Sequence, residues 1–273
     1  MQTAREQHLV EFFVKDFYKR TVELEIYLQE KYHLNFVRVV STRFDRTTEA
    51  ISRQVGFLSA RYLQALASQV ATIGIGWGNA VSYFVDETDY FLASHLTIIP
   101  LVGGMGLLNL DTHANKLASK IATKLNAQYS TFYAPVIAAS KKEANELKKS
   151  SLIASCLQAA KNVDVAFIGV GNEVESSTWR QLNYISQAET DALAQAGAIG
   201  DVVADFFDET GQRVQTDFSD RLIGITIDDL KRIPNVVAMA VGTPKTRSVR
   251  TLLENNVINA LVVDQDLAEA LVQ

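Results

Sequence analysis

The chain has 273 residues, which corresponds to one or two domains. Hydrophobic residues make up 48% of the sequence and charged residues 21%, a composition that excludes a disordered protein and is typical of a globular one. The net charge of −5 is divided into +2 over residues 1–65 and −7 over residues 66–273, so the main body offers a poor surface for nucleic acid.

Short apolar runs alternate with amphipathic stretches along most of the chain, which is typical of an α/β fold. In chain order, the pattern predicts helix 21–33, strand 36–40, helix 48–68, strand 72–75, helix 79–90, strand 96–101, helix 112–125, strand 128–132, helix 142–160, strand 164–168, helix 186–196, strand 236–240, helix 245–255, strand 260–263 and helix 265–272. Since strands joined by helices usually run parallel, we expect a Rossmann-like, mostly parallel sheet flanked by helices.

Two segments depart from this alternation. The turn sequence Asp208-Glu209-Thr210-Gly211 lies between the apolar residues 204–207 and the alternating residues 213–217, which predicts an inserted β-hairpin. Residues 1–20 have no complete pattern of their own, and the apolar run Phe12-Phe13-Val14 has no partner strand nearby. We expect these first residues to be the tail of a larger unit.

Membrane and disulfide-linked classes are excluded by simple counts. The longest apolar runs are far shorter than the roughly 20 residues of a membrane span, and no basic-then-apolar signal segment opens the chain. The sequence contains one cysteine, Cys156, so it forms no internal disulfide and no multi-cysteine metal site. We therefore expect a cytoplasmic protein that needs no metal or other cofactor.

Four predicted strands end in a glycine-bearing turn that is followed by a helix. These turns are Gly74-Ile75-Gly76-Trp77-Gly78-Asn79, Pro100-Leu101-Val102-Gly103-Gly104-Met105-Gly106, Gly169-Val170-Gly171-Asn172 and Gly242-Thr243-Pro244-Lys245. Glycine lets backbone amides approach a ligand closely, and open α/β sheets bind ligands at the carboxyl ends of their strands. One such turn is as often only a tight connection, but four together predict a crevice for an anionic small molecule.

Neither common nucleotide motif is present. A P-loop requires G-x-x-x-x-G-K-[ST], which does not occur in the chain. The dinucleotide motif requires G-x-G-x-x-G, whereas the turn at Gly74, Gly76 and Gly78 has the wrong spacing and the turn at Gly169 and Gly171 lacks the third glycine. These departures exclude the usual ATP and NAD sites.

Four side chains near the turns are candidates for contact with a ligand. Lys245 stands at a predicted helix start, where a cation is unfavourable unless it meets an anion such as phosphate; otherwise it is a solvated lysine. Asp201 could accept hydrogen bonds from sugar hydroxyls or could cap a turn. His113 could face the crevice or be structural, and Trp77 could stack on a ligand or form a wall.

Eight motifs in register resemble the effector-sensing domain of the SorC family of bacterial transcriptional regulators. They begin at Gly74, Ile99, Asp164, Gly197, Asp220, Ile233, Val241 and Leu261, and the resemblance covers about residue 21 to the end of the chain. It implies a fold related to phosphosugar isomerases and glucosamine-phosphate deaminases and a bound sugar or sugar phosphate. It also implies an oligomer, either a dimer or a tetramer, whose affinity for operator DNA changes when the ligand binds.

The resemblance also implies a division of the chain. A winged helix-turn-helix module normally precedes the effector domain in this family. We expect residues 1–20 to be the remnant of that missing module and residues 21–273 to be the effector-binding and oligomerisation domain. Operator DNA would then be contacted only through the missing module, and no membrane would be involved.

The family's ligand positions can be carried over to this sequence. By this resemblance, Lys245 contacts the phosphate, Asp201 contacts ligand hydroxyls and His113 makes a polar contact. The ligand-binding residues that we expect are Gly76, Trp77, Gly78, Asn79, Gly103, Gly104, Met105, His113, Gly171, Asp201 and Lys245. Many members carry Thr or Ser where this chain has Asn79-Ala80, which leaves room for an unphosphorylated sugar, and Val102 offers no charge for a second phosphate.

Three hypotheses follow from these features. The first is a sugar-responsive regulatory domain. The second is an isomerase or deaminase on the same fold, with Asp201 or His113 as the base and Lys245 as the anion anchor. The third is an interaction domain without a ligand, which the glycine turns argue against. The sequence favours the first because the turns offer amides and one lysine but no clustered acid–base pair.

Overall fold

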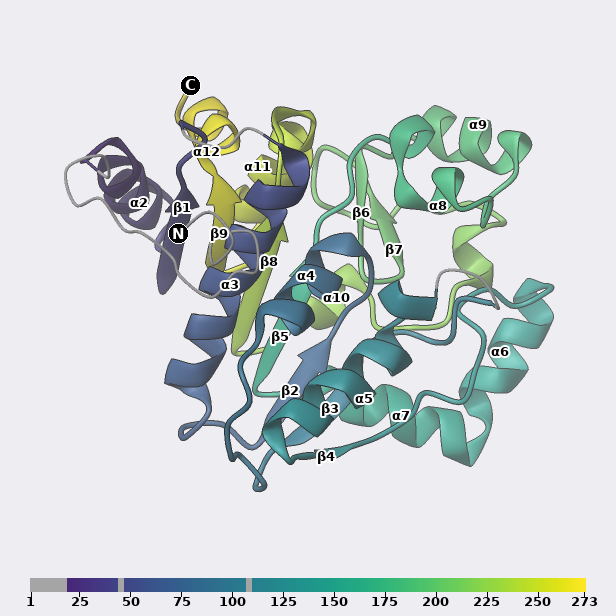
Figure 1. Cartoon of the computed structure of the whole chain (residues 1–273). Coiled ribbons are helices and arrows are strands. Elements are labelled where there is room, and N and C mark those ends of the chain that lie inside the picture. Colours follow the sequence, from purple (N-terminus) through teal and green to yellow (C-terminus); the bar gives the residue numbers. More distant parts are fainter. Residues whose placement is uncertain (1–18, 44–46, 107–109) are drawn as a thin grey trace.

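The computed structural model describes residues 19–43, 47–106 and 110–273, and the predicted run 12–14 lies outside these residues. The core is a seven-stranded sheet in the order β1-β9-β8-β5-β2-β3-β4, in which every neighbouring pair is parallel (Figure 1). Its strands are β1 (Phe36–Val40), β2 (Thr72–Ile75), β3 (Thr97–Pro100), β4 (Gln128–Tyr129), β5 (Val165–Gly169), β8 (Asn235–Ala240) and β9 (Ala260–Asp264). The predicted α/β fold with a parallel sheet is confirmed.

Helices cover both faces of this sheet, as expected of a parallel sheet buried on both sides. The described helices are α2 (Lys19–Tyr32), α3 (Thr48–Leu66), α4 (Asn79–Glu87), α5 (Ala114–Leu125), α6 (Lys141–Lys149), α7 (Ser151–Lys161), α8 (Thr178–Gln181), α9 (Gln187–Gln195), α10 (Ile227–Leu230), α11 (Thr246–Glu254) and α12 (Gln265–Val272). One hydrophobic cluster packs α3, α4 and α5 on one face, a second contains α2, α11 and α12 on the opposite face, and a smaller third lies around α6 and α7. None of the described helices is long and apolar enough to cross a membrane.

Two predicted elements differ from the structure. The single predicted helix 142–160 is two helices, α6 and α7, because Ser150 adopts an extended backbone (φ −62°, ψ 139°) and its side chain accepts a hydrogen bond from the amide of Ile153. Ser150 therefore caps a second helix rather than continuing the first. The predicted strand 128–132 pairs only over Gln128 and Tyr129.

A hairpin is present in this part of the chain, but its strands are not the pair that was predicted. Residues 205–207 form β7, but β7 pairs antiparallel with the preceding strand β6 (Gly200–Val202), through a turn in which Val203 has a φ of 52°. The expected second arm contributes only a bridge between Phe207 and Arg213. The expected turn is real, since Asp208 accepts hydrogen bonds from the amides of Thr210 and Gln212.

The sheet reverses its order of assembly between β2 and β5. From β2 the chain proceeds to β3 and β4 at one edge, whereas β5, β8 and β9 extend toward the other edge. The carboxyl ends of β2 and β5 therefore separate at the centre of the sheet, at a topological switch point, which is where open α/β sheets bind ligands. The β6–β7 hairpin lies beside the carboxyl ends of the central strands (Figure 1).

Candidate functional site

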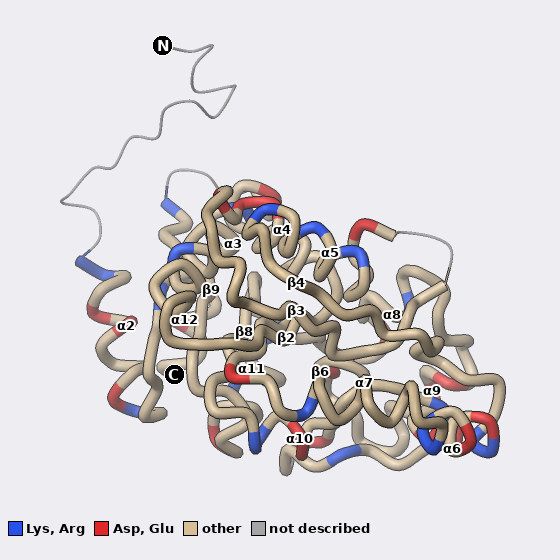
Figure 2. Tube along the Cα trace, turned by 90° about the horizontal axis from the view of Figure 1, so that it is seen from below, with Lys and Arg blue, Asp and Glu red and all other residues tan. Residues whose placement is uncertain are grey.

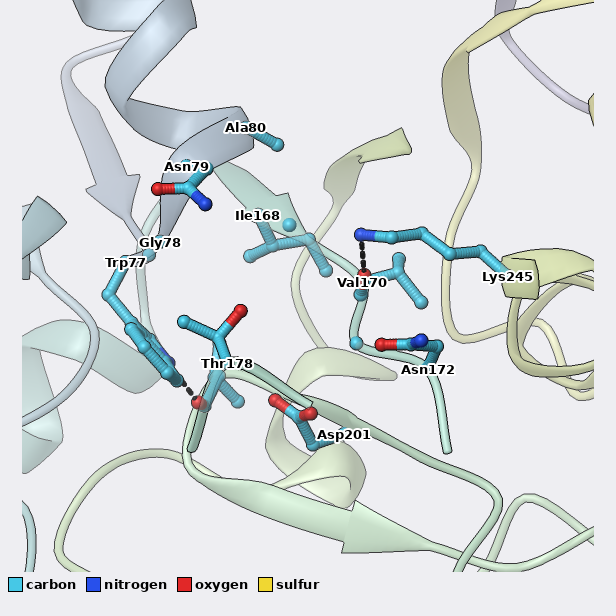
Figure 3. Close-up of a pocket in the computed structure, with 14 residues that line it drawn as sticks. Trp77, Gly78, Asn79, Ala80, Ile168, Val170, Asn172, Thr178, Asp201 and Lys245 are labelled. Carbon is cyan, nitrogen blue, oxygen red and sulfur yellow. Dashed lines mark hydrogen bonds between the residues drawn. The ribbon is translucent and has the colours of Figure 1, made fainter. Parts of the chain in front are cut away.

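A cavity of about 90 Å³ opens at this switch point and is partly open to solvent. Its walls come from the turn after β2, the turn after β5, the start of α8, the β6–β7 hairpin and the turn after β8. The lining residues are Gly76, Trp77, Gly78, Asn79, Ala80, Ile168, Gly169, Val170, Gly171, Asn172, Thr178, Asp201, Val203 and Lys245. Figure 3 shows Asn79, Lys245 and Asp201 approaching the cavity from three different sides.

The N-terminus of α4 provides backbone donors to this cavity. Gly78 is the N-cap, with a φ of 96° that favours glycine, and it makes no side-chain cap. The first hydrogen bond of the helix runs from Ser82 to Gly78, and within the described residues the amides of Asn79 and Ala80 have no protein acceptor. Unpaired amides at a helix N-terminus favour an anion.

Lys245 supplies a positive charge from the opposite wall. It ends the short 3-10 helix Thr243–Lys245, which follows β8, and its Nζ donates to the carbonyl oxygen of Val170 at 2.5 Å. No carboxylate of the described residues lies within ion-pair distance of this ammonium group. Burial lowers the pKa of Lys245, and the charge of Asp201 opposes that shift. The ammonium is thus partly desolvated and available to a bound anion.

Asp201 supplies a buried carboxylate from β6. Its side chain is 6% exposed, and its Oδ2 accepts a hydrogen bond from Nε1 of Trp179 at 3.0 Å. Burial raises the pKa of the Asp201 carboxyl to about 6, while the Trp179 hydrogen bond and the charge of Lys245 lower it. The hydroxyl groups of a sugar-like ligand can donate hydrogen bonds to this carboxylate.

The buried charge of Asp201 carries a stability cost that can be measured. Its pKa is higher in the folded chain than the ordinary value of 3.8, so this carboxyl makes the folded chain less stable as the pH rises through about 6. We expect Asp201→Asn, which keeps an oxygen acceptor for Trp179, to raise the free energy of unfolding at pH 7.5 by about 1–3 kcal/mol. At pH 4.5 the difference from the wild type should fall to roughly a third of this value, and it should disappear only below the ordinary pKa of 3.8.

Urea denaturation of both proteins at pH 7.5 and pH 4.5 checks this expectation. The exposed Asp217→Asn serves as the control and should change the free energy of unfolding at neither pH. Equal stability of Asp201→Asn and the wild type at pH 7.5 would show that the buried carboxylate does not lower the free energy of unfolding.

Seven of the eleven residues expected from the sequence line this cavity: Gly76, Trp77, Gly78, Asn79, Gly171, Asp201 and Lys245. The glycine amides among them are nevertheless occupied. Gly76 donates to the carbonyl of Phe167, Gly78 to that of Thr112 and Gly171 to that of Asp201. In this structure the free backbone donors at the cavity belong to Asn79 and Ala80, and ligand contact by the three glycines stays a prediction.

The other four expected residues lie outside the cavity lining. The amides of Gly103 and Gly104 donate to the carbonyls of Ile223 and Ala134, and their expected contact with a ligand stays a prediction. A Cβ at position 103 would lie 2.6 Å from the oxygen of Ala134, which explains the glycine as a close chain approach.

Met105 and His113 of the same strand-to-helix connection are both buried. Met105 is 2% exposed and belongs to the hydrophobic core. His113 is the N-cap of α5, and its Nε2 lies 3.0 Å from the hydroxyl of Tyr184. His113 does not line this cavity, and its expected contact with a ligand stays a prediction.

No pattern in the sequence points to Thr178 or Val203 as cavity residues. Thr178 begins a four-residue helix that was not expected, and Val203 occupies the turn of the re-paired hairpin. Asn172, by contrast, could have been found, since it directly follows the glycine turn after β5. Among the described residues there is no group of three His, Cys, Asp or Glu side chains that could hold a metal ion.

Comparisons with known proteins give a consistent result. A family model described as "Putative sugar-binding domain" matches residues 16–273. The chain is 25% identical over 274 residues to the transcriptional regulator LsrR of Enterobacter sp. (strain 638), and the match covers 99% of this chain and 81% of that protein.

Solved structures include close relatives of the whole fold. A DeoR family transcriptional regulator from Listeria monocytogenes is 30% identical with a TM-score of 0.85, and the match covers 92% of this chain and 99% of that one. The full-length sorbitol operon regulator SorC from Klebsiella pneumoniae is 25% identical with a TM-score of 0.87, and the match covers 100% of this chain and 88% of that one. These relatives are transcriptional regulators, not enzymes.

Proposed function

Because this chain belongs to the sugar-binding domain family of SorC- and DeoR-type transcriptional regulators, we propose that it senses a sugar monophosphate in the cavity between β2 and β5. The observation that carries the proposal is the pairing of two anion-binding features, the free amides at the start of α4 and the ammonium of Lys245, on opposite walls of one cavity. A phosphate group fits between such donors.

The remaining polar side chains suit the sugar part of the ligand. Asp201, Thr178 and Asn172 line the side of the cavity that lies away from α4, as Figure 3 shows. Their carboxylate, hydroxyl and amide groups can pair with sugar hydroxyls, which both donate and accept hydrogen bonds. One lysine and one helix N-terminus provide for one phosphate, so we do not expect a bisphosphate to be preferred.

Regulation would follow from a shift between two arrangements of the protein. A ligand that binds one subunit arrangement more tightly changes the affinity for operator DNA by no more than the difference between its two affinities. We propose that this chain assembles as a dimer or tetramer in the cytoplasm and that DNA is contacted by a helix-turn-helix module preceding residue 21, with residues 21–273 as the effector domain.

An isomerase or deaminase activity finds no support in the site. Such an enzyme needs a proton-transfer group against the substrate carbon. His113 is absent from the cavity lining, and the imidazole lies beside Tyr184 instead. The titratable side chains among the described lining residues are Asp201 and Lys245, and the proposal assigns Lys245 to the phosphate rather than to proton transfer.

A thermal-shift screen tests the proposal. We expect pentose and hexose monophosphates, but not the corresponding free sugars, to raise the melting temperature of the full chain. A ligand at 100 times its dissociation constant adds about 2.7 kcal/mol to the free energy of unfolding, which is easily detected. Inorganic phosphate and sulfate are the controls for the charge alone.

Two results would contradict the proposal. If free sugars and polyols stabilise the chain as strongly as their monophosphates, the phosphate is not recognised and the cavity takes an uncharged ligand. If none of the compounds raises the melting temperature, the domain does not sense a small sugar.

A further inference from the structure

Trp179 lies directly behind Asp201 and is fully buried, although it does not line the cavity. Four aromatic rings surround its indole, with centroid distances of 4.9 Å to Trp77, 5.7 Å to Phe206, 6.0 Å to Phe218 and 6.4 Å to Tyr184. Rings packed in this way leave the indole little freedom to rotate. The direction of its N–H bond is therefore fixed by the fold.

The two oxygens of the Asp201 carboxylate have different surroundings. Oδ2 accepts the indole N–H of Trp179 at 3.0 Å. Oδ1 has no hydrogen-bond partner among the described residues and lies 1.9 Å from the position that a Cβ at residue 171 would take. Gly171 thus makes room for Oδ1 at the cavity wall, and Lys245 is the charged group that faces Asp201 across the cavity.

We propose that Trp179 is a positioning residue whose indole N–H holds the Asp201 carboxylate with Oδ1 directed at the hydroxyl groups of the bound sugar. An indole N–H can only donate a hydrogen bond. It can therefore hold a carboxylate oxygen but cannot accept a hydrogen bond from a ligand. This inference rests on the proposed function, and it adds the residue that decides how much more tightly a sugar monophosphate binds than phosphate alone.

Trp179→Phe tests the inference by separating the sugar from the phosphate. Calorimetric titration of the full chain with inorganic phosphate and with pentose and hexose monophosphates gives the ratio of their dissociation constants. We expect Trp179→Phe to leave phosphate binding within about 2-fold of the wild type and to weaken the best sugar monophosphate about 10-fold, the effect of one lost hydrogen bond to a charged group. An unchanged ratio would overturn the inference.

The wild-type titration keeps the inference distinct from the proposed function. If the wild type binds no sugar monophosphate more tightly than inorganic phosphate, the proposed function fails and the inference fails with it. If the wild type prefers the sugar monophosphate and Trp179→Phe retains the full preference, only the inference fails.

A double-mutant cycle separates positioning from packing. If Trp179 acts through Asp201, then adding Trp179→Phe to Asp201→Ala, which leaves the indole N–H without its side-chain acceptor, should reduce the preference for sugar monophosphate no further. Phe218→Leu, which loosens the ring packing around Trp179 but retains the indole N–H, is the matched control and should preserve the preference. Additive effects of the two substitutions would contradict the inference.

A measurement on the unsubstituted side chain covers the case in which Trp179→Phe fails to fold. The sequence has two tryptophans, so the NMR spectrum of the folded chain contains two indole N–H signals. The spectrum of Trp77→Phe shows which signal belongs to Trp179. Trp77 donates to the carbonyl of Val203, which does not titrate. We expect the Trp179 signal alone to shift with a midpoint near pH 6 as Asp201 gains its proton. A Trp179 signal that does not move between pH 5 and 8 would overturn the inference.

Discussion

Lys245→Met is expected to weaken the binding of a sugar monophosphate by about 100-fold, because it removes a charge-assisted hydrogen bond to the phosphate inside a partly desolvated cavity. The methionine side chain has a similar length, so the wall of the cavity is retained. Inorganic phosphate should be weakened by a similar factor, since Lys245 contacts the charge and not the sugar. Calorimetric titration of both ligands measures the two factors.

The exposed Lys142→Met is the matched control for this experiment. It removes the same charge from the surface of α6 and should leave both dissociation constants unchanged. Raising the pH gives an independent check, because burial lowers the pKa of Lys245 and the binding of an anion should therefore weaken at a lower pH than for a solvated lysine. If Lys245→Met binds both ligands as tightly as the wild type, Lys245 does not contact the bound phosphate.

Gly171→Ala is expected to lower the free energy of unfolding by about 2–3 kcal/mol and to abolish the preference for sugar monophosphate over phosphate. The added Cβ would lie 1.9 Å from Oδ1 and 2.5 Å from Cγ of Asp201. The carboxylate can escape this overlap only by leaving Trp179, so the hydrogen bond at 3.0 Å is lost as well. In a chain of this size the melting temperature should fall by roughly 4–12 °C.

Gly169→Ala provides the control for stability in the same turn. A Cβ at residue 169 would meet its nearest neighbours, Ala80 and Trp77, at 3.7 Å, which is an ordinary contact distance. We expect its melting temperature to stay within about 2 °C of the wild type. A similar loss of stability in both variants would mean that the turn tolerates no side chain at all and that Asp201 is not the cause.

The order of most helices and strands could be predicted from the sequence because most of the sheet's strands are short apolar runs and most of the longer helices have an apolar stripe. The central strand β5 shows this directly, since all its residues up to Ile168 are buried. The break at Ser150 could not be predicted in the same way. A serine between two amphipathic stretches can continue a helix or cap a new one, and only the packing of α6 and α7 decides between them.

The part of the candidate cavity that lies at strand ends could be predicted from the sequence, whereas the part that depends on contacts distant in sequence could not. The turns after β2, β5 and β8 meet at the switch point, so Asn79, Gly171 and Lys245 were found together. Gly103 and Gly104 also follow a strand, but the segments around Ala134 and Ile223 cover their amides.

The residues that the sequence missed lie on an inserted part of the chain. Thr178 and Trp179 belong to α8, and Val203 belongs to the turn between β6 and β7. These elements reach the cavity only because the fold brings them beside the sheet edge, as when the amide of Gly171 bonds to Asp201. No spacing in the sequence specifies such contacts.

A crystal structure of the full chain with the most stabilising sugar monophosphate tests the central claim most directly. The expected result is a phosphate group within hydrogen-bond distance of the amides of Asn79 and Ala80 and of Nζ of Lys245, with a sugar hydroxyl on Oδ1 of Asp201. A ligand bound over Gly103 and Gly104, or one whose phosphate points away from α4 into solvent, would contradict the account.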